Sequence, residues 1–459
     1  MPGGNQRGRR LWALIAVLAI TFAIVGSSTV AGAAQLSGRL VAAHLEQNND
    51  QLDAYAFSLN GVRLVPATSA IGDQMAQLNG ATVTVTGTMS GGSLVVTGVA
   101  VAYSAALSTP PISSTSAPRK VAVIIAQYAD SVPASAATAR SIVFNGPDSL
   151  DSYLREVFAR STRVIGGRAD VNNGDVFGPV VLSRPTNANR CSVDTVLDEV
   201  GVALMFAGHY FGYESSYYDN AMVFLPDQPC SLRGLGYTPG NLFATRDPSL
   251  AVVAHEFGHN LGLGHAGGRK CWNSAGKRVS LAGSSGRCTT YSYADPFDEM
   301  GNRQLAGQGN RQYNALHKVQ LGALPANARV AATAGTPQYT IGFEEKPLGF
   351  PQLVEIPRRR LANGKVESFV VDYRAPYGHF DAWAPTDPVV NGITVRIHVS
   401  GLLQANEPDT VVVDATPGSR AGVDDFIDAP LAAGQSLHDP ISGVTITANA
   451  FALVPRSSL

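Results

Sequence analysis

Three histidines in the middle of the chain have a spacing suited to metal binding, in the stretch 255–265, which reads HEFGHNLGLGH. On a helix, His255 and His259 project from one face a turn apart, so both imidazoles can bind one ion. Gly262 can end that helix with a left-handed turn, and the returning chain then brings His265 to the same ion. Three neutral imidazoles favour Zn²⁺ and leave the fourth position to water.

The same stretch contains a carboxylate beside these ligands. Glu256 is not expected to bind the metal, and its position lets it take a proton from a zinc-bound water that attacks a peptide carbonyl. It would then return the proton to the leaving amine. The alternative is a helix whose histidines face solvent or cap its end, but this requires three of the nine histidines to reach ligand spacing by chance.

The helix that carries these residues has a packing signal of its own. An apolar stripe, separate from the histidines, would anchor it to the core and comprises Leu250, Val253, Phe257 and Leu261. Asp247 is expected to cap the N-terminus of this helix, with Pro248 in its first turn.

The residues before this helix predict an α/β block. The run 121–125 reads VAVII, which is typical of a central strand buried on both faces. One helix is expected after a cap at Asp148 and a second over 193–206, followed by a strand at 221–225. With the histidine-bearing helix they define an expected α/β domain at residues 120–327.

Both flanking regions have the alternating pattern of β structure. Residues 34–107 suit a small barrel or sandwich, and residues 108–119 form a Pro/Ser/Thr-rich linker. Residues 328–459 predict a β-sandwich. Its strands are expected at 338–343, 366–373, 392–399, 410–413 and 444–448. The expected fold class is therefore α+β with several domains, an α/β peptidase domain lying between two β domains.

The first residues carry an export signal. Residues 1–33 combine a basic start, an apolar run from Leu11 to Val25 and a small-residue end that reads AGA, which is the pattern of a cleaved signal peptide. The apolar run is short for a bilayer span, and an uncleaved membrane anchor is the alternative. The mature protein is expected to be secreted, with no membrane contact after cleavage.

Export makes disulfides the first interpretation of the four cysteines. They are Cys191, Cys230, Cys271 and Cys288, and three pairings are possible. Cys191–Cys230 and Cys271–Cys288 close the shorter loops and are favoured.

Charge excludes some partners. The net charge of −1 gives no general electrostatic case for nucleic acid. Residues 170–175 are interpreted as a turn, because they lack the closing glutamate of a calcium loop. The basic run Arg358-Arg359-Arg360 is interpreted as a solvated loop.

A second motif lies beyond His265, where the run 293–301 reads YADPFDEMG. An extended zinc motif followed by a methionine-centred turn is the metzincin signature, in which the thioether packs beneath the metal without binding it. With the run YNALHK at 313–318, these motifs make residues 120–325 resemble the gametolysin-like peptidases of the metzincin clan. The C-terminal β region resembles them more loosely.

The resemblance implies a zinc site and a function. It implies Zn²⁺ bound by His255, His259 and His265, with Glu256 as general base and Met300 in the Met-turn. The expected function is a secreted zinc endopeptidase acting on a protein or peptide substrate, with extracellular-matrix and cell-wall proteins as candidates. Two alternatives stay open: an exported adhesion or binding protein with a vestigial metal site, and a zinc hydrolase of a non-peptide bond.

The chain departs from the metzincin pattern at one position. Some metzincins have a tyrosine two residues after the Met-turn methionine, as an extra ligand or a transition-state donor, whereas this chain has Asn302 there. Tyr291 and Tyr293 are nearby candidates for that role, although packing is the simpler interpretation of both.

The N-terminal β region is expected to act as a pro-segment or as a permanent accessory domain. No cysteine precedes Cys191, so this region has no thiolate with which to block the metal. Asp73 offers a carboxylate for that purpose, although a surface turn is the simpler interpretation of its Ile-Gly-Asp sequence. Steric cover of the active site and binding of a separate partner both stay open.

Overall fold

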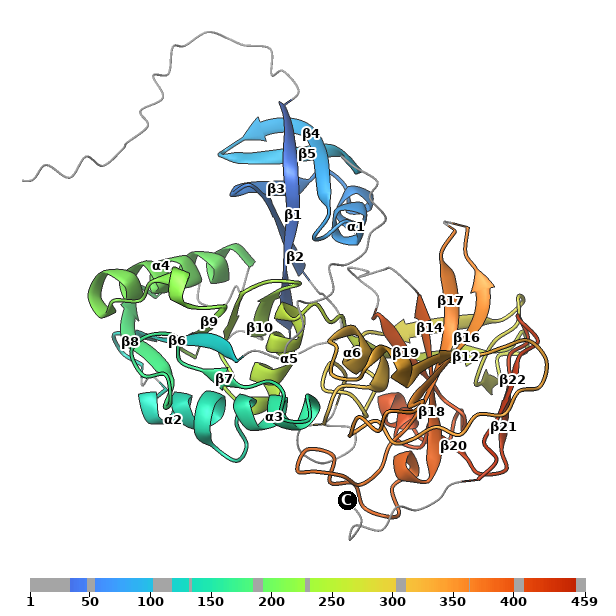
Figure 1. Cartoon of the computed structure of the whole chain (residues 1–459). Helices are drawn as coiled ribbons and strands as arrows, with labels where there is room; N and C mark the ends of the chain where they lie inside the picture. Colours follow the sequence, from blue (N-terminus) through green and yellow to red (C-terminus); the bar gives the residue numbers. More distant parts are fainter. Residues whose placement is uncertain are drawn as a thin grey trace, which may run out of the picture.

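The computed structural model describes most of the chain in three regions (Figure 1). The described residues are 34–47, 54–101, 118–131, 134–184, 193–227, 232–302, 311–362, 364–399 and 408–450. The expected signal peptide, nearly all of the expected linker and the expected Cys191–Cys230 pair lie outside these residues.

The N-terminal region is a closed five-stranded barrel. Its strands are β1 (Ala34–Gln47), β2 (Ala54–Leu59), β3 (Val62–Pro66), β4 (Thr82–Ser90) and β5 (Ser93–Val101). The order β2-β3-β5-β4-β1 closes through β1–β2, and the β3–β5 pair is parallel. With helix α1 (Ser69–Gln77) between β3 and β4, this is the arrangement of OB-type barrels.

The expected surface turn around Asp73 is wrong. Residues 71–73 belong to α1, whose first turn is capped by Thr68 accepting a hydrogen bond from Ile71 N. Asp73 is exposed on this barrel helix. The glycine at 72 suggested a turn, but the cap outweighs its low helix propensity.

Strand β1 extends beyond the barrel. Its first part pairs with β4, and its second part pairs with β2 on one side and with β10 (Leu232–Tyr237) on the other. Figure 1 shows β1 running from the barrel into the centre of the molecule. Barrel and α/β block therefore belong to one continuous path of hydrogen-bonded strands.

The α/β block is built around β6 (Arg119–Tyr128), which pairs in parallel with β8 (Asp175–Leu182) and β9 (Asn220–Phe224). The sheet continues through β11 (Leu242–Thr245) to β10, and β7 (Val164–Ile165) pairs with the start of β6. Alternate β6 residues enter two separate clusters of buried apolar side chains, as its continuous apolar run predicts. Strand β6 is thus buried on both faces.

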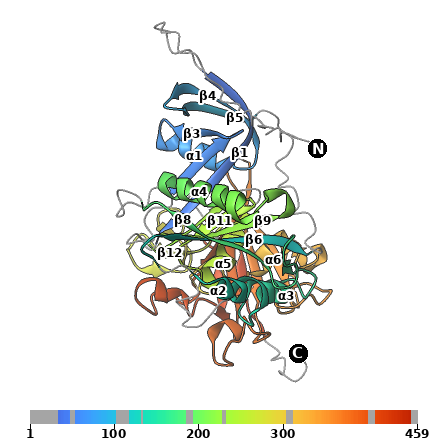
Figure 2. The same ribbon diagram turned by 90° about the vertical axis from the view of Figure 1, so that its left-hand side faces the viewer.

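Helices cover both faces of this sheet. Figure 2 shows α4 (Val193–Phe211) on the side of the barrel, and α2 (Ala136–Arg140), α3 (Leu150–Val157) and α5 (Leu250–Asn260) on the other. The residues that cap α3 and α5 are Ser149 and Ser249, so the predicted caps Asp148 and Asp247 are wrong. Each serine directly precedes the helix and accepts a hydrogen bond from a backbone N–H of its first turn.

The C-terminal region is dominated by a second large sheet. Its path is β13-β12-β19-β18-β17-β16-β15, with β14 on β12 and β20 on β18. The bounds are β12 (Ala266–Trp272), β13 (Arg278–Val279), β14 (Arg287–Tyr291), β15 (Arg329–Ala331), β16 (Leu353–Arg360), β17 (Val366–Tyr373), β18 (Gly392–Val399), β19 (Thr410–Val413) and β20 (Leu431–Ala432). Strands β17, β18 and β19 have the predicted bounds.

This sheet crosses the expected boundary between residues 327 and 328. Strand β12 follows His265 directly and pairs in parallel with β19, so the two expected domains share a sheet. Shorter elements complete the region: α6 (Ala315–Gln320), the hairpin β21 (Ser436–His438) and β22 (Thr445–Thr447), and the short helices η1 (Ser141–Asn145), η2 (Ser215–Tyr217), η4 (Ala326–Ala328), η5 (Pro388–Val390) and η6 (Gly422–Phe426).

Two predictions for this region are wrong. Residues 338–343 form no strand, and the strands between 328 and 366 are instead β15 and β16. Strand β16 contains the three arginines assigned to a solvated loop. Arg358 is buried in this strand and forms ion pairs with Asp439 (2.9 Å) and Glu367. Glu367 on the neighbouring strand and Asp439, 81 residues away, thus compensate the charge of this buried side chain.

Cys271 on β12 and Cys288 on β14 lie opposite each other and form a disulfide, as predicted from the short loop. With a sequence separation of 17 residues, replacing both cysteines by serine should lower the free energy of unfolding by about 2–4 kcal/mol. Urea denaturation followed by tryptophan fluorescence measures this change. The Ser284→Ala/Ser285→Ala variant, in the exposed loop between the two strands, should be unchanged; equal stability of both variants would contradict the prediction.

Candidate metal centre

Helix α5 positions two of the predicted ligands and the predicted base. Its apolar stripe enters the same buried cluster as strand β6, as predicted, and fixes the rotation of the helix. Gly262 follows the helix with φ +98°, the left-handed conformation that a glycine adopts without strain. The chain then turns back, and His265 directly precedes β12.

Hydrogen bonds behind the helix fix the tautomers of both helical imidazoles. The Nδ1 atom of His255 lies 2.8 Å from the carbonyl oxygen of Glu299, and that of His259 lies 2.8 Å from the carbonyl oxygen of Leu263. Because a carbonyl oxygen can only accept, each Nδ1 carries the proton and each Nε2 of the neutral rings carries the lone pair. This arrangement is usual behind histidines that bind metals.

The three predicted imidazoles come together. The ring centroid of His259 lies 4.9 Å from those of both His255 and His265, and the latter two rings are 5.5 Å apart. The Nε2 atoms of His259 and His265 are 3.1 Å apart. Two nitrogens bound to one tetrahedral zinc ion at about 2.0–2.1 Å lie about 3.3–3.4 Å from each other, so the spacing of the His259 and His265 nitrogens fits one Zn²⁺ ion.

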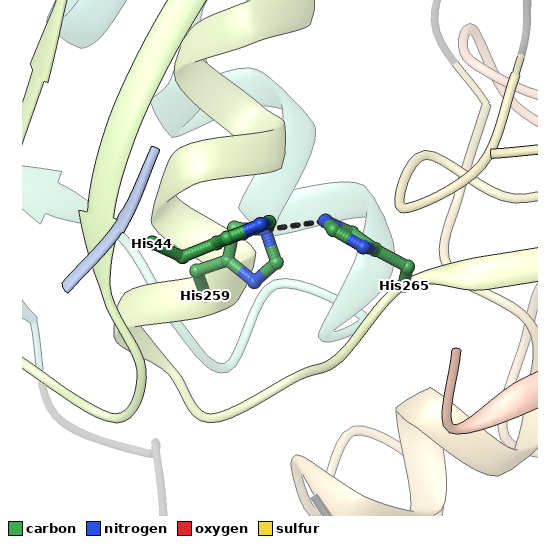
Figure 3. Close-up of side chains that lie close together, drawn as sticks. All are labelled: His44, His259 and His265. Carbon is green, nitrogen blue, oxygen red and sulfur yellow. Dashed lines mark hydrogen bonds between the residues drawn. The ribbon is translucent and has the colours of Figure 1, made fainter. Parts of the chain in front are cut away.

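A fourth histidine, which sequence reasoning missed, joins this group. His44 on β1 has a ligand nitrogen within 4.8 Å of those of His259 and His265, and all three side chains are buried. Figure 3 shows the three imidazoles converging from β1, from α5 and from the chain after it. An isolated histidine in a strand of another region carries no spacing signal, so His44 could not be found from the sequence.

Glycines on β10 make room for the carboxylate of Glu256. Glu256 is fully buried, and a Cβ atom at Gly234 would overlap its Oε1. A Cβ at Gly236 would lie 2.7 Å from Oε2. The carboxylate of Glu256, which is on the same helix as His255 and His259, therefore lies against the backbone of β10.

Met300 lies beneath the helix. Its side chain is fully buried, and a Cβ at Gly258 would overlap its sulfur, so the thioether contacts α5 within the turn between the two helical histidines. The backbone of Met300 accepts a hydrogen bond from Ala266 N (2.8 Å), which follows His265. The methionine turn and the third imidazole are thus joined through the backbone.

Of the tyrosines considered as extra site residues, Tyr293 is the nearer. Its ring centroid lies 4.2 Å from that of His265 and 6.0 Å from that of His255. Tyr291 lies on β14, with its ring 5.7 Å from the ammonium of Lys270. The backbone N–H of Asn302 donates to the carbonyl of Asp295 (2.9 Å) and helps to close the methionine turn.

A buried ion triad fixes the loops that carry His265 and Met300. The imidazole of His317 on α6 lies between two carboxylates, with Nδ1 2.9 Å from Asp298 and Nε2 2.9 Å from Asp409. Asp298 accepts a hydrogen bond from Met300 N, and Asp409 accepts one from Gly264 N (3.1 Å). Because both ring nitrogens face carboxylates, a protonated His317 can donate to each.

The charges of this triad follow from its geometry. Burial alone lowers the pKa of His317, but Asp298 and Asp409 outweigh this effect and raise the pKa to about 10. For Asp298 the directions are reversed. Burial raises the pKa of its carboxyl, but the imidazolium of His317 outweighs burial and lowers the pKa to about 2. The triad is therefore a buried cation between two anions around neutral pH.

The comparisons with known proteins leave the family open. No family model matches the chain, and no curated protein shows significant similarity to it.

Among the described residues, no helix combines the length and the apolar character needed to span a membrane.

The triad predicts how stability depends on pH. Because folding raises the pKa of His317 from 6.5 to about 10, the stabilisation is complete below pH 6.5 and is lost as the pH rises towards 10. The lowered pKa of Asp298 has the opposite effect, since its contribution, present above about pH 4, is lost as the pH falls towards 2. The free energy of unfolding, measured by urea denaturation, should therefore decrease between pH 7 and pH 10.

The matched variants are His317→Gln and, at an exposed position, His438→Gln. His317→Gln leaves two buried carboxylates without their cation and should lose about 3–5 kcal/mol at neutral pH. It should also flatten the alkaline part of the profile. An unchanged profile in this variant, or the same change in His438→Gln, would contradict the assignment.

Proposed function

We propose that this chain is an exported zinc endopeptidase of the metzincin type. One observation carries the proposal: imidazoles oriented by carbonyl groups converge beside a fully buried glutamate, with a methionine beneath the same helix. The sequence motifs and their order along the chain add support. The secreted location rests on the leader sequence and on the disulfide, which is typical of exported proteins.

His255, His259 and His265 would hold the metal through Nε2. Bound Zn²⁺ would polarise the substrate carbonyl and make water acidic enough to lose a proton near neutral pH. The carbonyl partners of Nδ1 keep the rings of His255 and His259 in the tautomer and orientation that binding requires. The protein thus supplies a preorganised donor set.

Glu256 would perform the proton transfers. Its carboxylate is buried one residue from His255 and is held against β10, so it can accept a proton from the attacking water and deliver it to the leaving amine. No covalent intermediate and no organic cofactor is needed.

A hydrolysis assay separates this function from its alternatives. The full chain is incubated with Zn²⁺ and an unfolded protein, with and without a chelator, and fragments are counted by mass spectrometry. Because His44 lies within the ligand group, the His44→Ala variant is assayed in parallel. Chelator-sensitive cleavage supports the proposal. A zinc-loaded protein that leaves peptides intact in both forms would contradict it and favour a binding protein or a hydrolase of a non-peptide bond.

The first prediction concerns the base. Glu256→Ala should retain stoichiometric zinc, measured by elemental analysis, because the imidazoles are unchanged. Its turnover should fall by about 10²–10⁴-fold, the usual contribution of a general base. The comparison is made in whichever form, unaltered or His44→Ala, turns over faster. Near-normal turnover with zinc bound would contradict the role of Glu256.

The second prediction concerns the space for that carboxylate. Gly234→Ala places a methyl group where the oxygen of Glu256 lies, so the carboxylate must move away from its position beside the ligands. Turnover should fall at least about tenfold while zinc stays bound. Gly201→Ala is the matched control, because a Cβ on α4 at that position meets no atom within 4 Å. Equal activity of the two variants would show that the position of Glu256 does not matter.

A further inference from the structure

We propose that His44 is a further ligand of the zinc site and that strand β1, paired on β10, closes this site in the full chain. The inference rests on the zinc site of the proposed function. It adds that this site is closed in the full chain, before any proteolytic removal of the barrel. Its starting point is the group of three ligand nitrogens, from His44, His259 and His265, that lie within 4.8 Å of one another. Two of these residues are ligands that the motif predicts, and the third comes from the barrel. The remaining predicted ligand, His255, is outside this group, with its ring centroid 4.9 Å from that of His259 and 5.5 Å from that of His265.

The barrel orients the ring of His44. In the ladder between β1 and β2, His44 lies directly opposite Tyr55, and the two rings stack with centroids 4.7 Å apart and planes 17° apart. Its other neighbours are the imidazoles of His265, at 4.9 Å, and of His259, at 5.6 Å. The ring is thus supported on one side by the barrel and faces the ligand group with the other.

The backbone around His44 covers the strand that borders the site. Residues 43–47 of β1 pair antiparallel with β10, and His44 lies opposite Gly236. Gly236 is one of the two glycines against which the carboxylate of Glu256 lies, and β10 pairs on its other side with β11. Without β1, the hydrogen-bonding groups of β10 would form a sheet edge that could pair with an extended polypeptide.

The barrel also contacts the α/β block through Ala43 and Ala56, which pack in the apolar cluster of that block. Arg63 and Asp194 form an ion pair of 2.6 Å whose side chains are about half exposed, and such pairs contribute at most about 1 kcal/mol. Asn79 donates a hydrogen bond to the carbonyl of Thr238, beside β10. Closure therefore depends on the β1–β10 pairing, on this apolar packing and on His44.

These contacts have a functional consequence. Three imidazoles leave one position of a tetrahedral zinc ion for water, and a fourth imidazole would fill it. The described N-terminal residues include no thiolate for this purpose, and His44 supplies a neutral nitrogen in its place. The full chain is thus latent, and hydrolysis requires that β1 leave β10.

Cobalt substitution tests the ligand directly. The full chain and its His44→Ala variant are loaded with Co²⁺, whose visible spectrum reports the ligand set, and are titrated with acetohydroxamate, a small metal-binding anion. His438→Ala, in the hairpin β21–β22, is the matched control. We expect acetohydroxamate to change the spectrum of His44→Ala at concentrations at least about tenfold lower than for the unaltered chain and the control. Equal titrations in all three would overturn the inference.

A second variant does not depend on losing a side chain. His44→Cys should introduce a thiolate-to-cobalt charge-transfer band in the near ultraviolet if residue 44 reaches the metal. His438→Cys should introduce no such band. Absence of the band from folded, cobalt-loaded His44→Cys protein, with folding verified by circular dichroism, would overturn the inference.

Peptide hydrolysis separates this inference from the proposed function. His44→Ala should hydrolyse an unfolded protein at least about tenfold faster than the unaltered chain and the His438→Ala control. If the site of the unaltered chain is open for less than about a tenth of the time, its rate of hydrolysis is lower by at least about tenfold. Equal activity, together with equal cobalt spectra, would overturn the role of His44 and leave the peptidase intact. The expected spectra without hydrolysis in either form would instead support the ligand and contradict the peptidase.

Discussion

The imidazolium of His317 fixes the two loops of the candidate metal centre to the rest of the molecule. His317 lies between the carboxylates of Asp298 and Asp409, and burial makes any one of the three charges costly without the others. Asp298 binds the backbone of the methionine turn, while Asp409 binds the backbone beside His265. Neither loop has regular secondary structure at these points, so their positions depend on this triad more than on local propensity.

Much of the site was predictable because its information is local. The spacing of His255 and His259, the apolar stripe of α5 and the glycine that ends it all lie within one short stretch, and helical periodicity alone places them. The buried strand β6 and the Cys271–Cys288 disulfide were predictable for the same reason. The caps of α3 and α5 were assigned too early, since Asp and Ser are both good caps and sequence preference does not separate them.

The unpredicted features arise from partners that are distant in the sequence. His44 reaches the site through the pairing of β1 with β10, and no local pattern in either strand specifies that pairing. Arg358 looked like a surface residue because one of its two carboxylate partners, Asp439, lies 81 residues away, and the pairing of the strands that carry Arg358 and Glu367 has no local signal. The parallel β12–β19 pair, which joins the expected peptidase and C-terminal domains, also lacks a local signal. Pairing at such separations depends on the assembled core.

The sequence separation between the donor and the acceptor of one hydrogen bond determines when the site can be completed during synthesis. Gly264 N donates to Asp409, 145 residues later, and β12 cannot pair with β19 until that strand has been made. A growing chain therefore exposes the helix with its two histidines long before the loop of His265 can be fixed. Contacts of this separation form late and slowly. The nascent chain therefore lacks a complete candidate site until residue 409 has been translated.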